Sequence, residues 1–374
     1  MSAPLTVVFA GGGTGGHLFP GIAIAEALRV LRPDARISFA GSAAKIEARV
    51  VPAHGYAFDP IWISGLRRSF SLATALLPLK LVVSVLQSAR LLRRRRPQVV
   101  VGTGGYVSGP VLWTAARLGL RTLIHEQNEY PGATTRTLAG LVDEVHITFE
   151  SSAQHLRTAR RVVRSGNPVR PSLRRIDTAE ARARFGLDPA QPVVFVFGGS
   201  LGAASINRAV RASLDRLAEA GLQVLWQTGA ADLTMARSAA ASHGGIVVQP
   251  FIDDMAAAYS AASLVVCRAG ATSLAELSAL AVPALLIPYP HAAADHQRRN
   301  ARAMEAAGAA AYLDDDALAG SDQRAFGDRV LALAGDGDAL VAMATRAAQM
   351  ARPDAARSIA EAIITLSHSA GRRG

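Results

Sequence analysis

Cysteine, lysine and aromatic residues are all scarce in this chain, and each shortage excludes a class of chemistry. The one cysteine, Cys267, stands in an apolar run, so we expect no disulfide framework, no cysteine-based metal site and a reduced, cytoplasmic setting. Lys45 and Lys80 are the only lysines, which leaves few candidates for Schiff-base catalysis. Aromatic residues make up 5% of the chain, too few to interleave with the arginines as in proteins that stack nucleic-acid bases.

Long uncharged runs are missing as well, and the start of the chain has no basic, signal-like segment, so we expect neither a membrane-spanning helix nor a secretory signal. The most apolar stretch, residues 70–96, places leucines and valines on one face and Lys80, Ser84 and Gln87 on another, with Pro78 as an expected kink. Arginines flank it and end it. Two hypotheses stay open, a helix on an anionic membrane surface or a core helix whose arginines complement its dipole.

The balance of charge indicates an anionic partner. Basic residues outnumber acidic ones by 40 to 29, which gives a formal net charge of +11 and a pI near 10.8. Such a chain suits nucleic acid, acidic lipid or a phosphorylated substrate. With 374 residues, 50% of them hydrophobic, and a mean hydropathy of +0.22, it is long and apolar enough for about two globular domains.

Short apolar runs alternate with helix-like segments, a pattern typical of parallel α/β sheets. The runs predicted as strands are residues 5–10, 37–40, 99–101, 122–125 and 145–148, then 193–197, 223–227, 246–248, 264–267 and 284–287. Both series place a glycine loop after their first strand, as VVFAGGGTGG and VFVFGGSLGA show. We therefore predict two Rossmann-like domains facing a cleft, residues 1–165 and 166–352, with a hinge near 165–171 and a last helix near 353–368 that packs on the first domain.

Residues 11–20, GGGTGGHLFP, form the densest glycine loop and begin with five glycines among six residues. Glycine permits positive φ and close backbone approach, and the helix that follows presents unpaired N–H groups to negative charge, so an anionic or sugar-phosphate ligand is expected. A dinucleotide site also needs an acidic residue after the second strand, where this chain has Gly41-Ser42-Ala43, and a P-loop needs lysine where it has His17. Both of those functions are disfavoured.

Eight motifs follow one another along the chain. They are GGGTGGHLFP (11–20), GGYVSGP (104–110), HEQN (125–128), GNPVR (166–170), GGSLGA (198–203), FIDDM (251–255), RAGATSLAE (268–276) and DHQRRNA (295–301). Together they closely resemble the MurG family of bacterial N-acetylglucosaminyltransferases. The resemblance implies a GT-B fold and inverting, metal-independent transfer of N-acetylglucosamine from UDP-GlcNAc to the C4 hydroxyl of lipid I, which yields lipid II for peptidoglycan on the cytoplasmic face of the inner membrane.

The resemblance also implies site residues. Glu276 would accept ribose hydroxyls, Ile252 would read uracil, and Arg170 would grip the departing phosphate. The donor-binding residues implied are Thr14, Gly15, Gly16, Asn128, Arg170, Ser200, Ile252, Ala271, Thr272, Ser273, Leu274, Ala275, Glu276 and Gln297, and the acceptor-binding residues are Gly13 and Tyr106.

His17 is the expected general base, because it ends the first glycine loop and imidazole titrates at about pH 6.5. His125 and Glu126 are rival bases, and a purely structural His17 is a further alternative, as is a satisfied structural pair of His125 with Glu126.

The acidic clusters look like metal ligands only superficially. We predict that the pair at 253–254 caps the helix after it and that residues 314–316 form a solvated turn, so we assign neither metal nor cofactor. The expected partners are UDP-GlcNAc, lipid I, an anionic membrane surface and other cell-wall synthesis or division proteins, without nucleic acid. The alternative functions are a UDP-GlcNAc 2-epimerase-like enzyme and a non-catalytic nucleotide-sugar-binding membrane scaffold.

Overall fold

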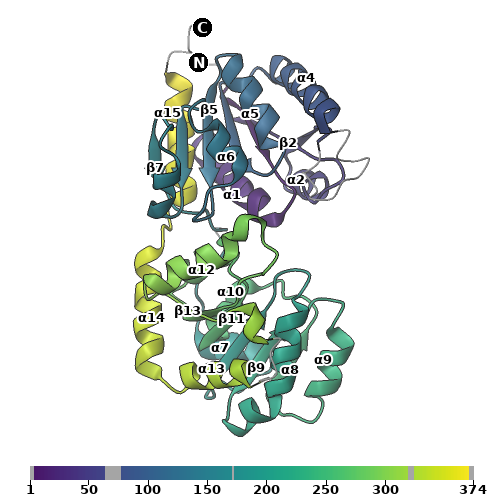
Figure 1. Cartoon of the computed structure of the whole chain (residues 1–374), viewed down its shortest axis with the longest axis vertical. Coiled ribbons are helices and arrows are strands. Elements are labelled where there is room, and N and C mark those ends of the chain that lie inside the picture. The colour runs from purple at the N-terminus through teal and green to yellow at the C-terminus, as the bar shows by residue number, and fades with distance from the viewer. Residues whose placement is uncertain (1–3, 64–76, 171, 319–323, 370–374) are drawn as a thin grey trace. The chain divides into compact units, whose positions relative to one another are not determined.

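The computed structural model describes residues 4–63, 77–170, 172–318 and 324–369, and its contacts divide the chain into two units (Figure 1). Unit 1 comprises Met1–Arg170 together with Arg352–Gly374, and unit 2 comprises Pro171–Ala351. Each unit has one parallel sheet covered by helices, which confirms the predicted α/β class with two Rossmann-like domains.

Unit 1 contains a seven-stranded sheet in the order β3-β2-β1-β4-β5-β6-β7, with every pair parallel. The order reverses between β1 and β4, and in open α/β sheets ligands bind beyond the carboxyl ends of the strands at such a point. The strands are β1 (Thr6–Gly11), β2 (Arg36–Gly41), β3 (Ala57–Pro60), β4 (Val99–Gly104), β5 (Arg121–Glu126), β6 (Glu144–Ile147) and β7 (Val162–Arg164). The helices are α1 (Gly15–Leu31), α2 (Glu47–Ala53), α4 (Leu77–Arg95), α5 (Ser108–Arg117), α6 (Ala133–Leu138), the 3₁₀ turn η1 (Glu150–His155) and α15 (Ala355–His368).

The first strand shows how both faces of this sheet become buried. Val7 and Phe9 of β1 belong to a core cluster that includes residues of α1 and, from the far end of the chain, Ile363 of α15. Val8 and Ala10, which alternate with them, belong to the cluster under α4 and α5. Since side chains alternate across a strand, a continuous apolar run is what a strand covered on both faces requires.

Unit 2 repeats the arrangement with six parallel strands in the order β10-β9-β8-β11-β12-β13. The strands are β8 (Val193–Phe197), β9 (Gln223–Gln227), β10 (Ile246–Gln249), β11 (Leu264–Cys267), β12 (Ala284–Leu286) and β13 (Ala311–Tyr312). The helices are α7 (Thr178–Arg184), α8 (Ala204–Glu219), α9 (Leu233–Ala240), α10 (Met255–Ala261), α11 (Ala271–Ala279), α12 (His296–Ala306), α13 (Ala325–Ala334) and α14 (Gly337–Met350), with 3₁₀ turns η2 (Ala293–Asp295) and η3 (Asp315–Leu318). Its order reverses between β8 and β11.

All ten predicted strands are present, and the sequence missed β3, β7 and β13. Each missed strand lies at an edge of its sheet, and each has only two to four residues. These three strands are short and hold at most two consecutive apolar residues each, so they give little of the apolar run on which the prediction relied, whereas β10, the fourth edge strand, has such a run in Ile246–Gln249.

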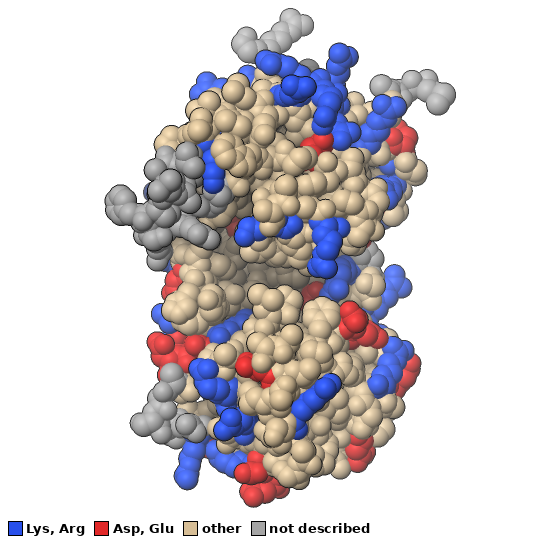
Figure 2. Space-filling model, turned by 90° about the vertical axis from the view of Figure 1, so that its right-hand side faces the viewer, with Lys and Arg blue, Asp and Glu red and all other residues tan. Residues whose placement is uncertain are grey.

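Helix α4 exposes the apolar side that an ordinary surface helix buries. Leu79, Val82 and Leu86 are 52%, 58% and 65% exposed, whereas Ser84 and Ser88 are fully buried. The Ser84 hydroxyl donates to the Leu81 carbonyl at 2.7 Å, so burial leaves it satisfied. On the face shown in Figure 2, Lys and Arg side chains gather at the top of unit 1, above a broad uncharged area.

The structure describes only part of the apolar stretch at residues 70–96. Residues 70–76 lie outside the described residues, and Pro78 stands in the first turn of α4, where proline is tolerated, rather than at a kink inside it. In the described ranges no helix is long and apolar enough to cross a bilayer.

Candidate active site

A buried carboxylate fixes the conformation of the glycine loop of unit 1, residues 11–16. Glu47 at the start of α2 is fully buried, and its two oxygens accept hydrogen bonds from the backbone N–H groups of Gly13 at 3.0 Å and Ser42 at 2.9 Å. A Cβ on Gly12, whose φ is +152°, would lie 2.4 Å from this carboxylate. Sequence analysis noted that no acidic residue ends β2 and missed Glu47, whose signal was an acid in the first turn of the following helix.

His17 lies in the first turn of α1, partly exposed, with its ring against the loop that follows β4. Gly104 there has a φ of +103°, and a Cβ on it would come within 2.5 Å of His17 Nδ1. Ser108 fixes this loop, because its Oγ lies 2.6 Å from the carbonyl oxygen of Ala10 and 2.7 Å from that of Gly104, which share its one hydrogen, and accepts from the Gly104 N–H at 3.1 Å. The strand order reverses between β1 and β4. The segments at the carboxyl ends of these two strands therefore pack together against the His17 imidazole.

The HEQN segment, residues 125–128 at the carboxyl end of β5, also contacts the His17 imidazole. Gln127, which is 1% exposed, lies 3.0 Å from His17 Nδ1 through its Oε1. Its Nε2 lies 3.0 Å from Nδ1 of His125. His125 is fully buried, and this desolvation, more than any neighbouring charge, lowers its pKa to about 4. A buried neutral imidazole cannot contact a substrate. His125 therefore supports Gln127 from the protein interior.

Glu126 has a different task from the one expected of a base. Its carboxylate accepts hydrogen bonds from Thr135 Oγ1 at 2.6 Å and from the N–H groups of Gly132 and Asn128 at 2.9 and 3.1 Å. Four such bonds, with the Asn128 side chain as the fourth donor at 3.3 Å, hold the loop from 126 to 135. These bonds give Glu126 a structural role in the loop, and which residue acts as the base stays a prediction.

Around His17 the structure places the other predicted residues of unit 1 at the carboxyl edge of the sheet. Gly13 and Thr14 are exposed, Gly15, Gly16 and Asn128 are partly exposed, and Tyr106 is 54% exposed. Arg170, which ends the first segment of unit 1, is exposed, and its contact with phosphate stays a prediction.

In unit 2, the best-formed anion site is the start of α11. Gly270, the N-cap residue, has no side chain that could cap the helix, and the first turn of α11 consists of Ala271, Thr272 and Ser273. The Thr272 hydroxyl is buried and finds no hydrogen-bond partner in the described part of the chain. A helix N-terminus beside an unsatisfied hydroxyl suits a diphosphate.

The remaining donor candidates surround this helix. Glu276 is 5% exposed near its end and accepts a hydrogen bond from Tyr259. The N–H of Ile252 donates to Gln227 Oε1 at 2.9 Å, so this amide hydrogen is already engaged, and Gln227 Nε2 donates to Gly199 at 3.0 Å. Leu274 is buried and Ala275 partly so, Ser200 is exposed in the glycine loop before α8, and Gln297 on α12 accepts from the N–H of Tyr289 at 2.9 Å.

The acidic residues near these loops correct one expectation and confirm another. Asp254 caps α10 through the N–H of Ala257 at 3.0 Å, as predicted. Residues 314–316 do not form a merely solvated turn, since Asp315 pairs with Arg268 at 2.5 Å and accepts from Ser205 at 2.7 Å. Arg268 also donates to the carbonyls after β12, so it ties three loops together, a role the sequence did not indicate.

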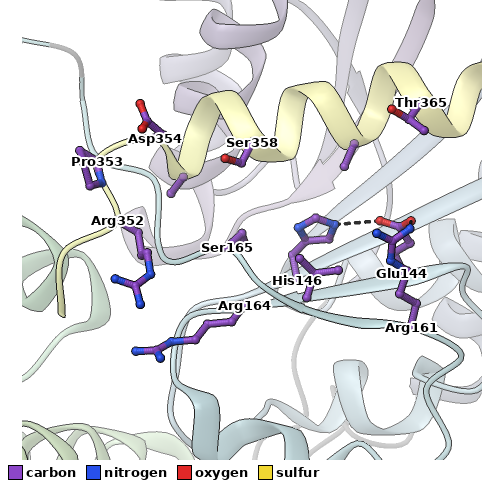
Figure 3. Close-up of a pocket in the computed structure, with 13 residues that line it drawn as sticks. Glu144, His146, Arg161, Arg164, Ser165, Arg352, Pro353, Asp354, Ser358 and Thr365 are labelled. Carbon is purple, nitrogen blue, oxygen red and sulfur yellow. Dashed lines mark hydrogen bonds and ion pairs between the residues drawn. The ribbon is translucent and has the colours of Figure 1, made fainter. Parts of the chain in front are cut away.

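Within the described ranges, no three His, Cys, Asp or Glu side chains gather as metal ligands would. A pocket of about 490 Å³ lies elsewhere in unit 1, between β6, β7 and α15 (Figure 3). One of its carboxylates is paired, since Glu144 accepts from His146 at 3.0 Å and from Arg161 at 3.0 Å. None of the predicted site residues lines it.

Two domain models of one protein family match this chain, each mainly within one unit. The Glycosyltransferase family 28 N-terminal domain matches residues 7–147, and the Glycosyltransferase family 28 C-terminal domain matches residues 193–359.

Full-length relatives carry one name. A protein of Chlorobium luteolum named UDP-N-acetylglucosamine--N-acetylmuramyl-(pentapeptide) pyrophosphoryl-undecaprenol N-acetylglucosamine transferase is 45% identical over 97% of this chain and 99% of its own length. One of Salinibacter ruber with the same name is 45% identical over 96% of both chains. The crystal structure of Acinetobacter baumannii MurG superposes with a TM-score of 0.77 and 28% identity over 97% of this chain and 100% of that one.

Proposed function

Since the chain belongs to glycosyltransferase family 28 and, within it, to the MurG family, we propose that it transfers N-acetylglucosamine from UDP-GlcNAc to lipid I, giving lipid II in peptidoglycan synthesis. The observation that carries this proposal is the 45% identity, over nearly the whole of each chain, to proteins named for that transfer. The start of α11 behind Gly270, with the buried Thr272 hydroxyl, and the glycine loops of both units agree with a sugar-diphosphate donor.

In the reaction, the C4 hydroxyl oxygen of the acceptor attacks the anomeric carbon of N-acetylglucosamine. The bond from that carbon to the diphosphate oxygen breaks, and UDP leaves with the electron pair. The hydroxyl proton passes to His17, and attack opposite the leaving group inverts the configuration to a β-1,4 bond. His17 suits this role because it is partly exposed at the switch point of the sheet, whereas His125 is buried and Glu126 is engaged in four hydrogen bonds.

Residues of unit 2 bind the donor, UDP-GlcNAc. The first-turn N–H groups of α11 and the Thr272 hydroxyl bind the diphosphate, which leaves as charge accumulates on it. Glu276 accepts the ribose hydroxyls, and Gln297 and Ser200 contact the sugar and a phosphate. The N–H of Ile252 already donates to Gln227. The carbonyl of Ile252 is therefore the backbone group that accepts a hydrogen bond from uracil.

We further propose that unit 1 binds the cytoplasmic face of the inner membrane peripherally through α4. The support is an exposed apolar row, Leu79, Val82 and Leu86, on a helix that ends in arginines. Apolar side chains enter the interface while arginines attract anionic headgroups. Lipid I carries an undecaprenyl tail, so its sugar has to be met at the membrane surface.

One assay separates this function from its alternatives. UDP release and products are measured from UDP-GlcNAc with and without a soluble lipid I analogue. Release that requires the analogue and yields a β-1,4-linked disaccharide supports the transferase. Conversion of UDP-GlcNAc into its 2-epimer without acceptor indicates the epimerase-like alternative, and donor binding with neither product indicates the scaffold.

A further inference from the structure

Three side chains of unit 1 form a hydrogen-bonded chain beneath the proposed base. His17 Nδ1 lies 3.0 Å from Gln127 Oε1, Gln127 Nε2 lies 3.0 Å from His125 Nδ1, and His125 Nε2 lies 2.9 Å from the carbonyl oxygen of Gly166. Gln127 and His125 are 1% and 0% exposed, so water does not replace these partners. The chain therefore begins in the protein interior and ends at the ring that faces the substrate.

The direction of each bond follows from the carbonyl at its inner end. A carbonyl oxygen only accepts, so His125 Nε2 must carry the hydrogen that it donates to Gly166. Burial keeps His125 neutral at working pH, which leaves a lone pair on Nδ1. That lone pair requires a donor, and Gln127 Nε2 is the group that faces it.

The orientation of the Gln127 amide follows from the groups around its nitrogen, whose two hydrogens face three acceptors, so that one hydrogen is shared between two of them. Its nitrogen lies 2.9 Å from the carbonyl oxygen of Thr103 and 3.0 Å from that of His125. Rotating the amide by half a turn would place its oxygen against both carbonyls and the lone pair of His125. The amide oxygen must therefore face His17, and because it only accepts, His17 Nδ1 must carry a hydrogen.

We infer that Gln127 is a positioning residue that holds His17 in the tautomer protonated on Nδ1, so that Nε2 is the nitrogen that receives the acceptor's proton. This inference rests on the proposed function for the identity of that proton. The backbone of Gly104 packs against the His17 ring near Nδ1 and also restricts the orientation of the ring.

An amide suits this position better than a carboxylate. It does not titrate, and it satisfies a fully buried position without adding a charge beside His125, which burial keeps neutral. When Nε2 takes the proton, Nδ1 keeps its hydrogen, and the bond to Gln127 becomes charge-assisted. The same contact thus holds the ring before and after proton transfer.

The test begins with the unaltered protein and needs no activity. Imidazole nitrogens that carry hydrogen are distinguished from those that do not by ¹⁵N NMR of histidine-labelled protein above the histidine titration range, with His17→Ala and His125→Ala used for assignment. We expect His17 to be protonated on Nδ1 and His125 on Nε2. A His17 protonated on Nε2 would overturn the inference.

The variant Gln127→Met keeps the size of the side chain and removes both amide functions. Its kcat should fall about 10- to 100-fold, with KM for UDP-GlcNAc within about twofold of the parent, because a wrong tautomer or a freely rotating ring disables the base and not donor binding. The NMR spectrum should show a mixture of His17 tautomers.

Gln223→Met is the matched control. Gln223 is also buried, at 3%, but it lies at the amino end of β9, where its amide bonds Asp188 at 2.8 and 2.9 Å. It should lose stability without loss of kcat or change at His17. A Gln127→Met protein with the parent's kcat and a single Nδ1-protonated His17 contradicts the inference.

Failure of the inference and failure of the function are distinguishable. If the parent makes no disaccharide but shows the expected tautomers, the function is wrong and the arrangement of His17 stands. If the parent transfers and His17 is protonated on Nε2, the function stands and the role of Gln127 is wrong. If Gln127→Met does not fold, the tautomers of the parent still decide.

Discussion

Glu276 on α11 accepts, through Oε2, a hydrogen bond of 2.9 Å from the phenol of Tyr259 on α10. The carboxylate is 5% exposed and the phenol is fully buried, so the bond fixes the side chain before any ligand arrives. A carboxylate held in one orientation gains more from two ribose hydroxyls than a mobile one, because less conformational entropy is lost on binding. If Glu276 binds the ribose as proposed, this bond preorganises it for the donor.

The first prediction concerns this carboxylate. Glu276→Ala should raise KM for UDP-GlcNAc about 10- to 100-fold, because charge-assisted hydrogen bonds are worth roughly 1.5 to 3 kcal/mol. Tyr259→Phe, which removes only the orienting bond, should raise it less. Steady-state kinetics and calorimetry with UDP measure both effects. If the KM for the lipid analogue rose instead while donor binding stayed level, Glu276 would not bind the ribose.

The second prediction concerns Gly104, where a methyl group would reach the His17 ring at 2.5 Å. Gly104→Ala should lower kcat at least about 10-fold, since displacing a reacting group by about 1 Å costs up to about 10²-fold. Gly55→Ala is the control, because Gly55 also has positive φ, +74°, but an added Cβ there meets nothing within 4 Å. Both variants should lose stability, and only Gly104→Ala should lose kcat. Equal activities would mean that the ring is not seated on Gly104.

The third prediction is a pH dependence of the stability of unit 1. The folded-state pKa of His125 is lowered to about 4, whereas an exposed histidine titrates at about 6.5, so the unfolded chain binds this proton first. The stabilisation is complete above about pH 6.5 and is lost as pH falls toward 4, by about 1.4 kcal/mol per pH unit from this group.

His125→Asn removes that titration. Urea unfolding at several pH values, read by hydrogen exchange of peptides from β1 and β5, gives the free energy of unfolding of unit 1. The difference in stability between the parent and the variant should shrink between pH 6.5 and 4.5. A difference that stays constant over this range would show that His125 is not buried neutral.

The fourth prediction concerns membrane attachment. The protein should co-sediment with vesicles that contain anionic lipid, and high salt should weaken this binding. Replacing Leu79 and Leu86 together by serine should reduce binding at least about 10-fold, because each leucine buried in the interface contributes up to about 1.5 to 3 kcal/mol.

Val341→Ser is the control for this experiment, since Val341 is 68% exposed on α14 of unit 2. It should leave vesicle binding unchanged. Equal binding to neutral vesicles at any salt concentration would remove the electrostatic part of the proposal, and full binding by the double variant would remove the apolar part.

Most of the fold was predictable because buried parallel strands are continuous apolar runs. The strand at 193–197 was predicted at its observed bounds, since both of its faces are covered. The strands β3, β7 and β13 were not, because each is short and holds at most two consecutive apolar residues.

Sequence analysis could name candidates for the site where a residue type has few other uses, as with the glycines at 11–16 and His17. It could not do so where a common residue acts through a distant partner. Gln127 stood inside a motif that sequence analysis quoted, yet its role depends on His17, 110 positions away, and on the Gly166 carbonyl. Glu47 and Arg268 were missed for the same reason, since their partners lie in other loops.

The central claim is that His17 takes the acceptor's proton, and the kcat of His17→Ala tests it most directly. The measurement is made beside His125→Ala and Glu126→Gln, with donor affinity and Tm determined for each. We predict a fall in kcat of about 10²- to 10⁴-fold for His17→Ala, with donor affinity preserved and the acidic limb of the pH profile lost. His125→Ala and Glu126→Gln should instead lower Tm along with rate, because both side chains hold the fold of the loops. A His17→Ala enzyme whose kcat stays within a few-fold of the parent would contradict the account.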